Sequence, residues 1–416
     1  MFTLFIRSRL ASLLLGAMAS TTVTAQAPLD LAAVLDQTLR QHPVLARIDA
    51  ERRLFDPTVA LARQSPPLEL GVEVENIGDD GSDQLETTLS LAGVLEWGGQ
   101  RDARALVATA GNRATELALQ QQRRDVLAAA ASRFIALVGS QQALALAQEA
   151  EAVFRMTHEA TRKRQRAGAA SQADVQRAGL SLEKARMAVA NAEQAVKSAR
   201  LALQISMGAA SPITAAVSAP LNRLPALPQA EELAALAQSA PAVNYAHARL
   251  SIARSQLELA RRQSRLSPGW SIGVRDSRER KDQSLVAGIS IPLGQARRNR
   301  PNHERAVADL NIAEHERDIA RLDLQGLLID SWQALSAWKR EAETLDTQLV
   351  PQAEAIVRAL RSGYAQGRYS LLELNSAQQQ LNILREQRLS AQIQYHQGWI
   401  ELERLLGRPL IPENHS

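Results

Sequence analysis

Two short segments of the chain carry the same polar residues at the same spacing. They are Gly168, Ser171 and Asp174 in the first segment and Gly367, Ser370 and Glu373 in the second, 199 residues further along. A serine followed three residues later by an acid is the pattern of a capping box at the start of a helix. A glycine shortly before it permits the positive φ that ends the preceding helix. We therefore predict two helix-to-helix turns with serine N-caps.

The residues around these turns offer a second kind of chemistry. Tyr364 and Arg368 flank the second turn, and a basic run that includes Arg164 and Arg166 precedes the first. Hydrogen bonds that involve a charged group contribute roughly 1.5–3 kcal/mol. We expect Asp174, Tyr364 and Glu373 to form hydrogen bonds or ion pairs between helices, in addition to any capping role.

A further set of carboxylates lies in segments of alternating polarity. Leucine and valine occupy the even positions from Leu68 to Val74, and Glu69, Glu73 and Glu75 lie between or beside them. Such period-two alternation over about ten residues is typical of a transmembrane β-strand. It places Glu69, Glu73, Glu75 and, from later strands, Glu86 and Arg275 on the polar face. Rings of carboxylates around a pore would favour cations, although polar residues could equally do no more than hydrate such an interior.

Other active or binding sites find little support in the sequence. No phosphate-binding loop, zinc-binding HExxH helix or GxSxG turn is present, so we expect neither an enzyme nor a cofactor. The seven histidines are scattered and there is no cysteine, which leaves no predicted metal site or disulfide. Basic residues alternate with acids as on a solvated helix face, and no nucleic-acid patch is visible.

Long helices must position these groups. Aromatic residues make up only 3% of the 416 residues, and the abundance of Ala, Leu, Gln, Arg and Glu is typical of long helices. No proline occurs between Arg101 and Arg166. The helix after the first turn repeats an apolar seam every seven residues, with alanine on the adjacent seam, which predicts a left-handed coiled coil. The large seam positions are Val175, Leu182, Val189, Val196 and Leu203.

The same order of segments occurs twice, so we predict two internal repeats. The divisions are 1–25, a signal peptide; 26–211, the first repeat; 212–228, a linker; 229–408, the second repeat; and 409–416, a short tail. After an initial helix, the first repeat has strands 68–76 and 84–95, a long helix 99–166, a turn and a helix 171–207. The second has strands 270–276 and 283–293, a long helix 302–363, a turn and a helix 370–406.

The N-terminal segment predicts export. Arg7 and Arg9 precede an apolar run over residues 10–19, and small residues end at Ala25, which together are typical of a cleaved secretory signal. Without a cysteine the chain cannot be lipidated on that residue. Four predicted strands cannot close a barrel, and an open sheet edge is not tolerated in lipid. If the strands span a membrane, two chains would supply eight strands and three would supply twelve.

The repeated strand–strand–helix blocks and turns resemble those of the TolC-like outer-membrane efflux factors. That family's second turn matches Tyr364, Gly367, Ser370 and Glu373, and "LEWGGQR" at residues 95–101 resembles the branch that works with heavy-metal (cobalt–zinc–cadmium) exporters. The resemblance implies a homotrimer with a twelve-stranded outer-membrane barrel continued by a coiled-coil tunnel in the periplasm. It also implies a passive conduit for metal cations or small amphiphilic compounds.

In such a channel the two turns would form the periplasmic tip. The resemblance then implies that Gly168, Ser171, Asp174, Tyr364, Gly367, Arg368, Ser370 and Glu373 form a gate and dock a periplasmic adaptor, which joins an inner-membrane exporter of the resistance-nodulation-division type. Trp97 and Trp270 would anchor the periplasmic rim of the barrel at the headgroup level. The alternative is a periplasmic coiled-coil structural or interaction protein without a pore, which would leave the alternating strands unexplained.

Overall fold

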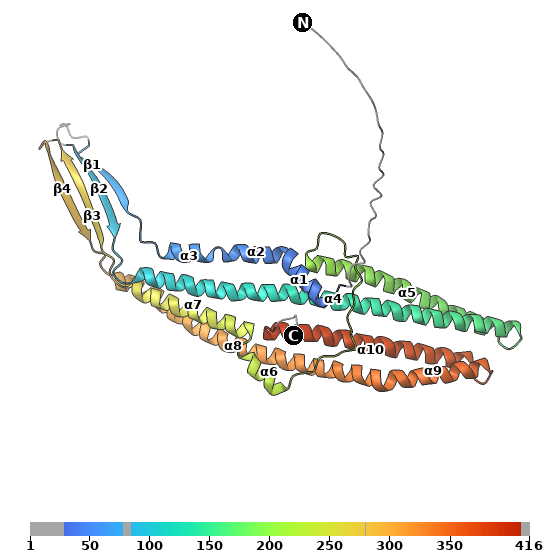
Figure 1. Cartoon of the computed structure of the whole chain (residues 1–416). Coiled ribbons are helices and arrows are strands. Elements are labelled where there is room, and N and C mark those ends of the chain that lie inside the picture. Colours follow the sequence, from blue (N-terminus) through green and yellow to red (C-terminus); the bar gives the residue numbers. More distant parts are fainter. Residues whose placement is uncertain (1–28, 78–84, 279, 409–416) are drawn as a thin grey trace, which may run out of the picture.

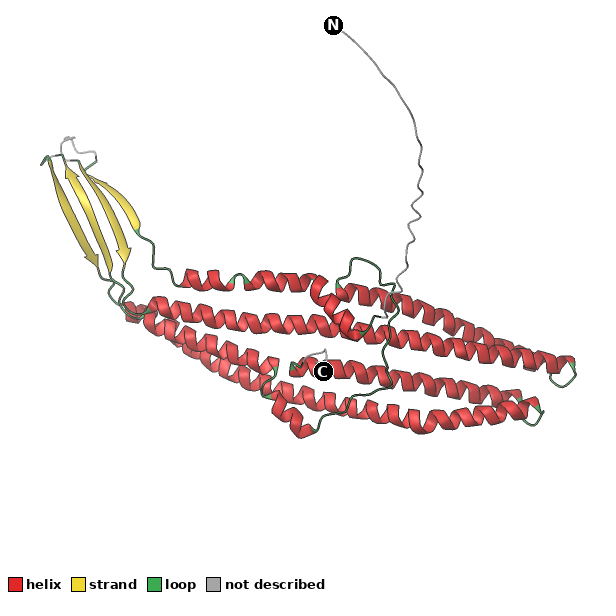
Figure 2. Cartoon of the chain, viewed as in Figure 1, coloured by secondary structure: helices red, strands yellow, loops and turns green. Residues whose placement is uncertain are grey.

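The computed structural model describes residues 29–77, 85–278 and 280–408. The predicted signal peptide, the predicted loop over residues 78–83 and the tail 409–416 lie outside these residues. The molecule is elongated, with a small sheet at one end and long helices that run from the sheet to two turns at the other end (Figure 1). All strands lie in that one region, and the rest of the described chain is helix and connecting loop (Figure 2).

The sheet is antiparallel and its four strands lie in chain order. They are β1 Glu69–Glu75, β2 Glu86–Val94, β3 Gly269–Ser277 and β4 Asp282–Ser290. The β2 and β3 strands come from opposite halves of the chain, yet they pair along their whole length. Pairing across the two halves makes one continuous sheet, so both predicted repeats contribute to each of its faces.

In the first half, three short helices run along one long helix. They are α1 Leu31–Gln41, α2 Pro43–Arg52 and α3 Phe55–Ala62, where a single helix was expected. The long helix α4, Gln100–Arg166, has 67 residues, which corresponds to a length of about 100 Å. After the first turn, α5, Gln172–Met207, returns alongside α4. Pro43 begins α2 because proline fits the first turn of a helix, where its missing N–H costs nothing.

The second half has the same order of elements but a different long helix. It contains α6 Ala230–Ala237, α7 Pro241–Gln263, α8 Gln295–Thr344, η2 Leu345–Leu349, α9 Val350–Ala365 and α10 Leu371–Leu406. The prediction of one helix over residues 302–363 is wrong at its start and in its interior. The helix begins seven residues earlier and runs through Pro301, since a carbonyl left free near an exposed helix start can bond water.

The interior of that helix is interrupted by η2, one π-helical turn. A π-turn inserts an extra residue into the α-helical ladder, and such turns often occur at functional positions. Pro351 follows directly, at the beginning of α9, where its missing N–H removes a donor from the ladder. The sequence analysis identified no heptad pattern in this helix, so it gave no sign of the extra residue.

The predicted heptad seam of α5 faces inward. Ala178, Leu182, Ala185 and Leu203 are buried, whereas the intervening valines are partly buried. Leu182 and Ala185 pack with Phe154 of α4. Alanine on one side of the seam lets the two helix axes approach closely, as the alternation of large and small residues predicts.

The linker between the halves is held against the helices. The backbone N–H of Leu29 donates to the carbonyl oxygen of Ala216 at 2.8 Å, and Leu29 forms an isolated parallel bridge with Val217. The hydroxyl of Tyr395 on α10 donates to the carbonyl oxygen of Pro225 at 2.6 Å. These contacts fix the crossing between the halves near the middle of the molecule.

Candidate functional site

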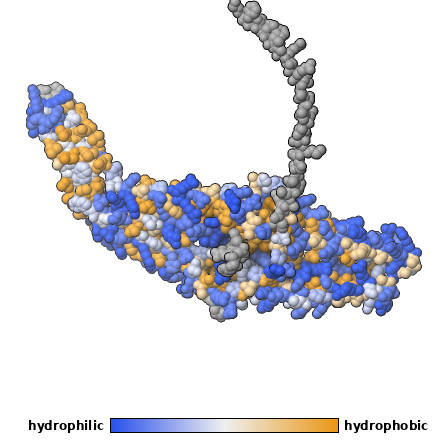
Figure 3. Space-filling model, in the orientation of Figure 1, coloured by the Kyte–Doolittle hydropathy of each residue, from blue (hydrophilic) through white to orange (hydrophobic). Residues whose placement is uncertain are grey.

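The sheet has one apolar and one polar face. Register brings Leu70, Leu91 and Ile272 together in one row across three strands, and Val72, Leu89 and Val274 in the next. Most of these side chains are exposed although they are large and apolar. In Figure 3 the apolar residues cover much of the sheet, and its loop end is hydrophilic. An exposed apolar surface of this kind marks contact with lipid or with another protein.

The opposite face carries the predicted acidic residues, and it also carries their basic partners. The Arg275 guanidinium lies 3.2 Å from a carboxylate oxygen of Glu75 and 3.2 Å from one of Glu86. It also donates to the hydroxyl of Thr88 at 3.0 Å. Arg280 reaches the other oxygen of Glu86 at 3.4 Å. Two of the four predicted carboxylates, Glu75 and Glu86, are therefore paired, and Arg280 adds a second basic group to the predicted Arg275.

Charge on this face is concentrated toward the loop end of the sheet. In the register of the four strands, one row consists of Glu75, Glu86, Ser277 and Asp282. Asp282 was not among the residues predicted for this face. Two rows closer to the helices, Gly71, Ser90 and Gly273 lie side by side. Glu69 and Glu73 have no basic side chain within 4 Å among the described residues. The polar face thus has a paired charged rim, a row of small residues and two carboxylates left unpaired.

Both predicted tryptophan anchors lie at the helical end of the sheet. Trp97 follows β2 and is 75% exposed. Trp270 is the second residue of β3, where it lies between Gly93 of β2 and Ile289 of β4 in register. Its indole lies so close to Gly93 that a Cβ there would be 3.0 Å from the ring nitrogen. Glycine at residue 93 therefore makes room for the half-buried indole.

The two turns at the far end of the molecule have nearly the same backbone. Gly168 has φ 73° and Gly367 has φ 76°. Ser171 and Ser370 both have φ −80° and ψ 160°, and each forms the predicted capping box with the acid three residues later. The identical spacing in sequence therefore produces identical local structure, because every hydrogen bond of a capping box lies within four residues.

Each of the two acids caps the helix to which it belongs. The carboxylate of Asp174 accepts hydrogen bonds from the hydroxyl and backbone N–H of Ser171, at 2.7 and 3.1 Å. Glu373 accepts the same pair from Ser370, both at 2.8 Å. The expectation of inter-helix bonds from these acids is wrong within the described chain. The Ser171 hydroxyl holds the pKa of Asp174 below its usual value, and the backbone N–H of Ser370 does so for Glu373.

Tyr364 does make the predicted inter-helix contact. It is buried, and its hydroxyl lies 2.9 Å from the hydroxyl of Thr161 on α4. Thr161 gives its only proton to the carbonyl oxygen of Thr157, so Tyr364 must be the donor. Arg164 donates to the backbone carbonyl of Tyr364, and its guanidinium lies 4.7 Å from the centre of the tyrosine ring. These contacts join the first helical hairpin, α4–α5, to the second, α9–α10.

A second buried contact lies further along the same seam. The side-chain amide of Gln378 on α10 donates to the hydroxyl of Thr157 at 3.2 Å. Thr157 passes its proton to the carbonyl of Val153, so two threonines one helical turn apart accept one bond each from the second hairpin. Thr157, Thr161 and Arg164 were not among the predicted site residues. The sequence did contain a signal for such partners. The residue of the first turn that corresponds to Tyr364 is Gln165, so the turn itself needs no tyrosine and Tyr364 has another role.

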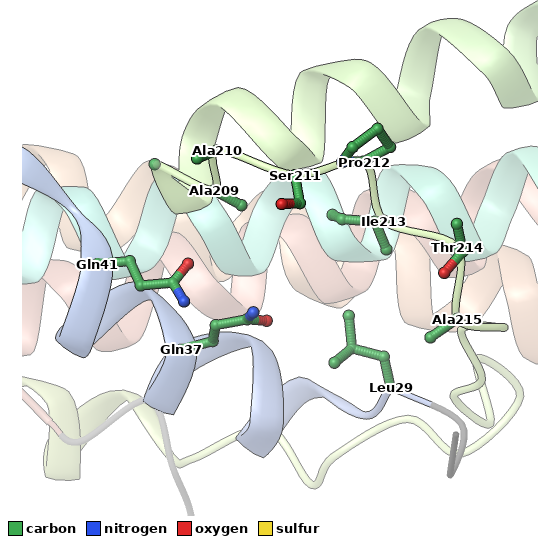
Figure 4. A pocket seen from close by; sticks show the side chains of 11 residues that line it. Leu29, Gln37, Gln41, Ala209, Ala210, Ser211, Pro212, Ile213, Thr214 and Ala215 are labelled. Carbon is green, nitrogen blue, oxygen red and sulfur yellow. The ribbon is translucent and has the colours of Figure 1, made fainter. Parts of the chain in front are cut away.

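A pocket lies beside α1, far from both of these regions. It has a volume of about 760 Å³ and is bordered by Gln37, Gln41 and the loop of residues 208–215 (Figure 4). Its lining side chains are uncharged, so it offers no group for acid–base or metal chemistry. Among the described residues no group of three His, Cys, Asp or Glu side chains is arranged to hold a metal ion.

Comparison with known proteins assigns the chain to a family. The model of the family named outer membrane efflux protein matches residues 19–209 and 233–408. This chain belongs to the outer membrane efflux protein family. The match spans both halves and omits only the N-terminus, the segment around the linker and the last residues. The predicted resemblance to TolC-like outer-membrane efflux factors is confirmed.

Individual efflux proteins are similar over nearly the whole chain. The cobalt-zinc-cadmium resistance protein CzcC of Cupriavidus metallidurans is 28% identical over 386 residues, which cover 92% of this chain and 91% of that protein. A solved structure of CusC has a TM-score of 0.77 at 16% identity, covering 91% of this chain and 92% of that one. The open state of the MtrE outer membrane channel of Neisseria gonorrhoeae has a TM-score of 0.75 at 17% identity, covering 93% and 91%.

The fold and the composition of the helices of this chain agree with its membership of the outer membrane efflux protein family. The fold of the two solved structures is the fold found here, with a small sheet and long helices. In the part of the chain that the structure describes, no helix has the length and apolarity needed to cross a bilayer. The family is one of efflux channels, and enzymatic activity is not part of its description.

Proposed function

We propose that three copies of this chain form an outer-membrane channel of a tripartite efflux pump. Each copy would contribute its four strands to one twelve-stranded barrel and its helices to a periplasmic tunnel. The observation that carries this proposal is the exposed apolar face on a sheet that ends at β1 and β4. An open edge in lipid would leave backbone N–H and C=O groups unpaired, so the sheet must be completed by other copies.

In this arrangement the apolar face contacts lipid and the polar face lines the lumen. The loop end of the sheet lies outside the cell, and the helices lie in the periplasm. We place Trp97 and Trp270 at the periplasmic rim, where tryptophan prefers the headgroup level. The signal peptide over residues 1–25 would be cleaved on export, and the chain would carry no lipid on cysteine. The two halves, 26–211 and 229–408, would be repeats of one ancestral unit.

The helical turns would form the periplasmic tip of the tunnel, with six turns in a trimer. We propose that this tip docks a periplasmic adaptor, which couples the channel to an inner-membrane exporter of the resistance-nodulation-division type. The predicted tip residues would include Arg368, whose exposed side chain leaves it accessible to a partner. The contact of Tyr364 with Thr161 would hold the two hairpins of each copy together in the resting state.

Metal cations are the cargo that we favour. The printed name of the similar protein CzcC refers to cobalt, zinc and cadmium resistance, and Glu69 and Glu73 would add unpaired carboxylates to the lumen. Small amphiphilic compounds are the other class considered at the sequence level. The channel itself would conduct passively, because selection of the cargo belongs to the exporter.

A planar bilayer experiment tests the channel and its lumen together. The purified full-length chain should migrate as a trimer after cross-linking and should conduct ions with a preference for cations across a salt gradient. Changing Glu69 and Glu73 to Gln should reduce that preference, whereas Arg275→Gln should increase it by releasing Glu75 and leaving Glu86 with Arg280 alone. Absence of conductance would contradict the channel proposal. Conductance with an unchanged preference in both variants would contradict only the assignment of the lumen.

Orientation is tested with single cysteines, since the chain has none of its own. A cysteine at Asp282 at the loop end of the sheet should react with an impermeant reagent on whole cells. A cysteine at Ala169 in the first turn should react only after the outer membrane is opened. The reverse pattern would show that the chain is inserted the other way round.

A further inference from the structure

The chain crosses between the sheet and the helices at four places. These crossings are residues 63–68 before β1, 95–99 after β2, 264–268 before β3 and 291–294 after β4. Each is short, so the residues of all four lie in one layer between the strands and the helices (Figure 1). Under the proposed function this layer lies at the level of the periplasmic headgroups of the outer membrane.

Each crossing, or the first turn of the helix that follows it, carries an exposed arginine that has no carboxylate partner among the described residues. They are Arg63, Arg101, Arg265, and the adjacent pair Arg297 and Arg298. Arg101 donates to the hydroxyl of Ser65 at 3.1 Å and Arg265 to the carbonyl of Gly98 at 3.4 Å. None of the five has an Asp or Glu oxygen within 4 Å among the residues that the structure describes, although other arginines of this layer do, such as Arg104 with Glu96.

Each crossing also carries an exposed apolar side chain on the strand side of its arginine or next to it. Leu68, Trp97, Leu266 and Leu293 are all exposed, Leu293 by 86%. Trp97 and Arg101 are four residues apart, as are Leu293 and Arg297, with the apolar residue before the helix start and the arginine in the first turn of the helix. The order from the sheet outward is therefore apolar surface, then positive charge. This order matches that of acyl chain and phosphate in a lipid.

From this pattern we infer that the four crossings form a collar that binds the phosphate groups of anionic phospholipids in the periplasmic leaflet. The inference rests on the proposed function, which puts the apolar face of the sheet in the membrane. Basic residues close to a membrane surface each contribute about 1 kcal/mol of attraction to anionic lipids, and arginine can donate two parallel bonds to one phosphate. In a trimer the collar would contain at least one arginine at each of the twelve crossings.

Charge complementarity favours lipid over other occupants of the layer. The carboxylates in or next to this layer are those of Glu69, Glu96, Asp102 and Glu258. Glu96 is paired with Arg104, and Glu258 with Arg261 and Arg262, so arginines outnumber the carboxylates that are left. The basic groups are spread around the base of the sheet rather than gathered into one pocket. A free anion needs several donors converging on one point, whereas an annulus of lipid headgroups needs single donors at intervals.

The test compares lipids and variants on the intact trimer. The detergent-solubilised full chain is titrated with phosphatidylglycerol, with phosphatidylcholine and with inorganic phosphate, and bound molecules are counted by native mass spectrometry. We expect phosphatidylglycerol to bind at least about tenfold more tightly than phosphatidylcholine, from several arginines acting together. Raising the salt concentration should weaken this preference, because exposed charges are screened.

The variant carries Arg63→Gln, Arg265→Gln and Arg297→Gln, one substitution at each of three crossings. A matched control carries Arg162→Gln, Arg166→Gln and Arg361→Gln, three exposed arginines near the turns at the other end. The first variant should lose most of the preference, and the control should keep it. Equal binding of the two lipids by the parent chain, or equal loss in both variants, would overturn the inference. Displacement of phosphatidylglycerol by an equal concentration of inorganic phosphate would overturn it too, by showing a free-anion site.

Conductance of the same preparations in phosphatidylcholine bilayers separates this inference from the proposed function. If the parent and both variants conduct but no lipid preference is found, the collar is wrong and the channel stands. If the parent does not conduct, the channel proposal fails, and the collar fails with it. Because exposed substitutions usually change stability by less than about 0.5 kcal/mol, both variants should remain folded trimers.

Discussion

The two turns at the far end of the molecule share one backbone and differ in what surrounds it. Their glycines, N-cap serines and capping acids correspond position by position. Among the described residues nothing lies within 4 Å of a Cβ added at Gly168, whereas Tyr364 and Tyr369 pack at the second turn. At Gly363 a Cβ would clash with the ring of Tyr369, and Tyr364 beside it is buried against the first hairpin.

This comparison separates two kinds of interaction that stabilise the turns. The capping box and the positive-φ glycine stop one helix and start the next, and they do so in both turns without help from the rest of the fold. The tyrosine contacts join one hairpin to the other and occur at the second turn alone. The second turn should therefore be the more firmly held of the two, and the substitutions below measure by how much.

Removing the tyrosine should have the largest effect. Tyr364→Ala deletes a buried ring and its bond to Thr161, and we expect the second turn to lose about 3 kcal/mol or more of opening free energy. Gln165→Ala, the equivalent change in the first turn, should alter opening by less than about 0.5 kcal/mol. Amide hydrogen exchange over α9 and the start of α10, compared with α4 and α5, measures both. Similar losses in the two turns would show that the tyrosine contact does not distinguish them.

Alanine in place of the turn glycines should affect both turns equally. Gly168→Ala and Gly367→Ala each force a side chain into the left-handed region, at a cost of roughly 1–2 kcal/mol. Neither position is crowded enough for contacts to add much, since the nearest group to an added Cβ at Gly367 is the Arg164 guanidinium at 3.7 Å. Limited proteolysis at each turn, with rates compared to the parent, is a suitable measurement. A much larger effect at Gly367 would show that this backbone depends on the tyrosine contacts.

Removal of the N-cap hydroxyls should cost somewhat less. Ser171→Ala and Ser370→Ala each leave helix N–H groups without their side-chain acceptor, and we expect about 1 kcal/mol for each. The effect should be independent of Tyr364. A double-mutant cycle of Ser370→Ala with Tyr364→Phe, followed by hydrogen exchange, should give a coupling energy near zero. Strong coupling would mean that cap and tyrosine act as one unit.

Lowering the pH should weaken both capping boxes, and this effect should be the smallest of the four. The pKa values of Asp174 and Glu373 are lowered in the folded chain, so each ionised carboxylate stabilises its turn above its unfolded pKa. That contribution is lost as the pH falls through the lowered folded value, and it is insensitive to pH near neutrality. Hydrogen exchange at the two turns should show parallel losses on acidification. Asp174→Asn and Glu373→Gln should remove the pH dependence at their own turn and leave the other unchanged.

Beyond the turns, sequence periodicity predicted which residues share a face but not which faces meet. Alternation correctly placed Leu70 and Val72 opposite Glu69 and Glu73, because side chains of a strand must point to alternate sides. Heptads correctly predicted the buried side of α5. The π-helical turn η2 was not predicted, although Pro351 just after it removes a donor from the helical ladder.

The sequence alone determined those features whose hydrogen bonds or contacts join residues only a few positions apart. The turns, their caps, the alternation of the strands and the helical seams belong to this class. Only the tertiary structure decided that β2 pairs with β3, that Arg275 neutralises Glu75 and Glu86, and that Tyr364 donates to Thr161. These partners are close to 200 residues apart or belong to different halves. Their meeting depends on the lengths of α4 and α8 and on the register of the sheet, which no short stretch of sequence contains.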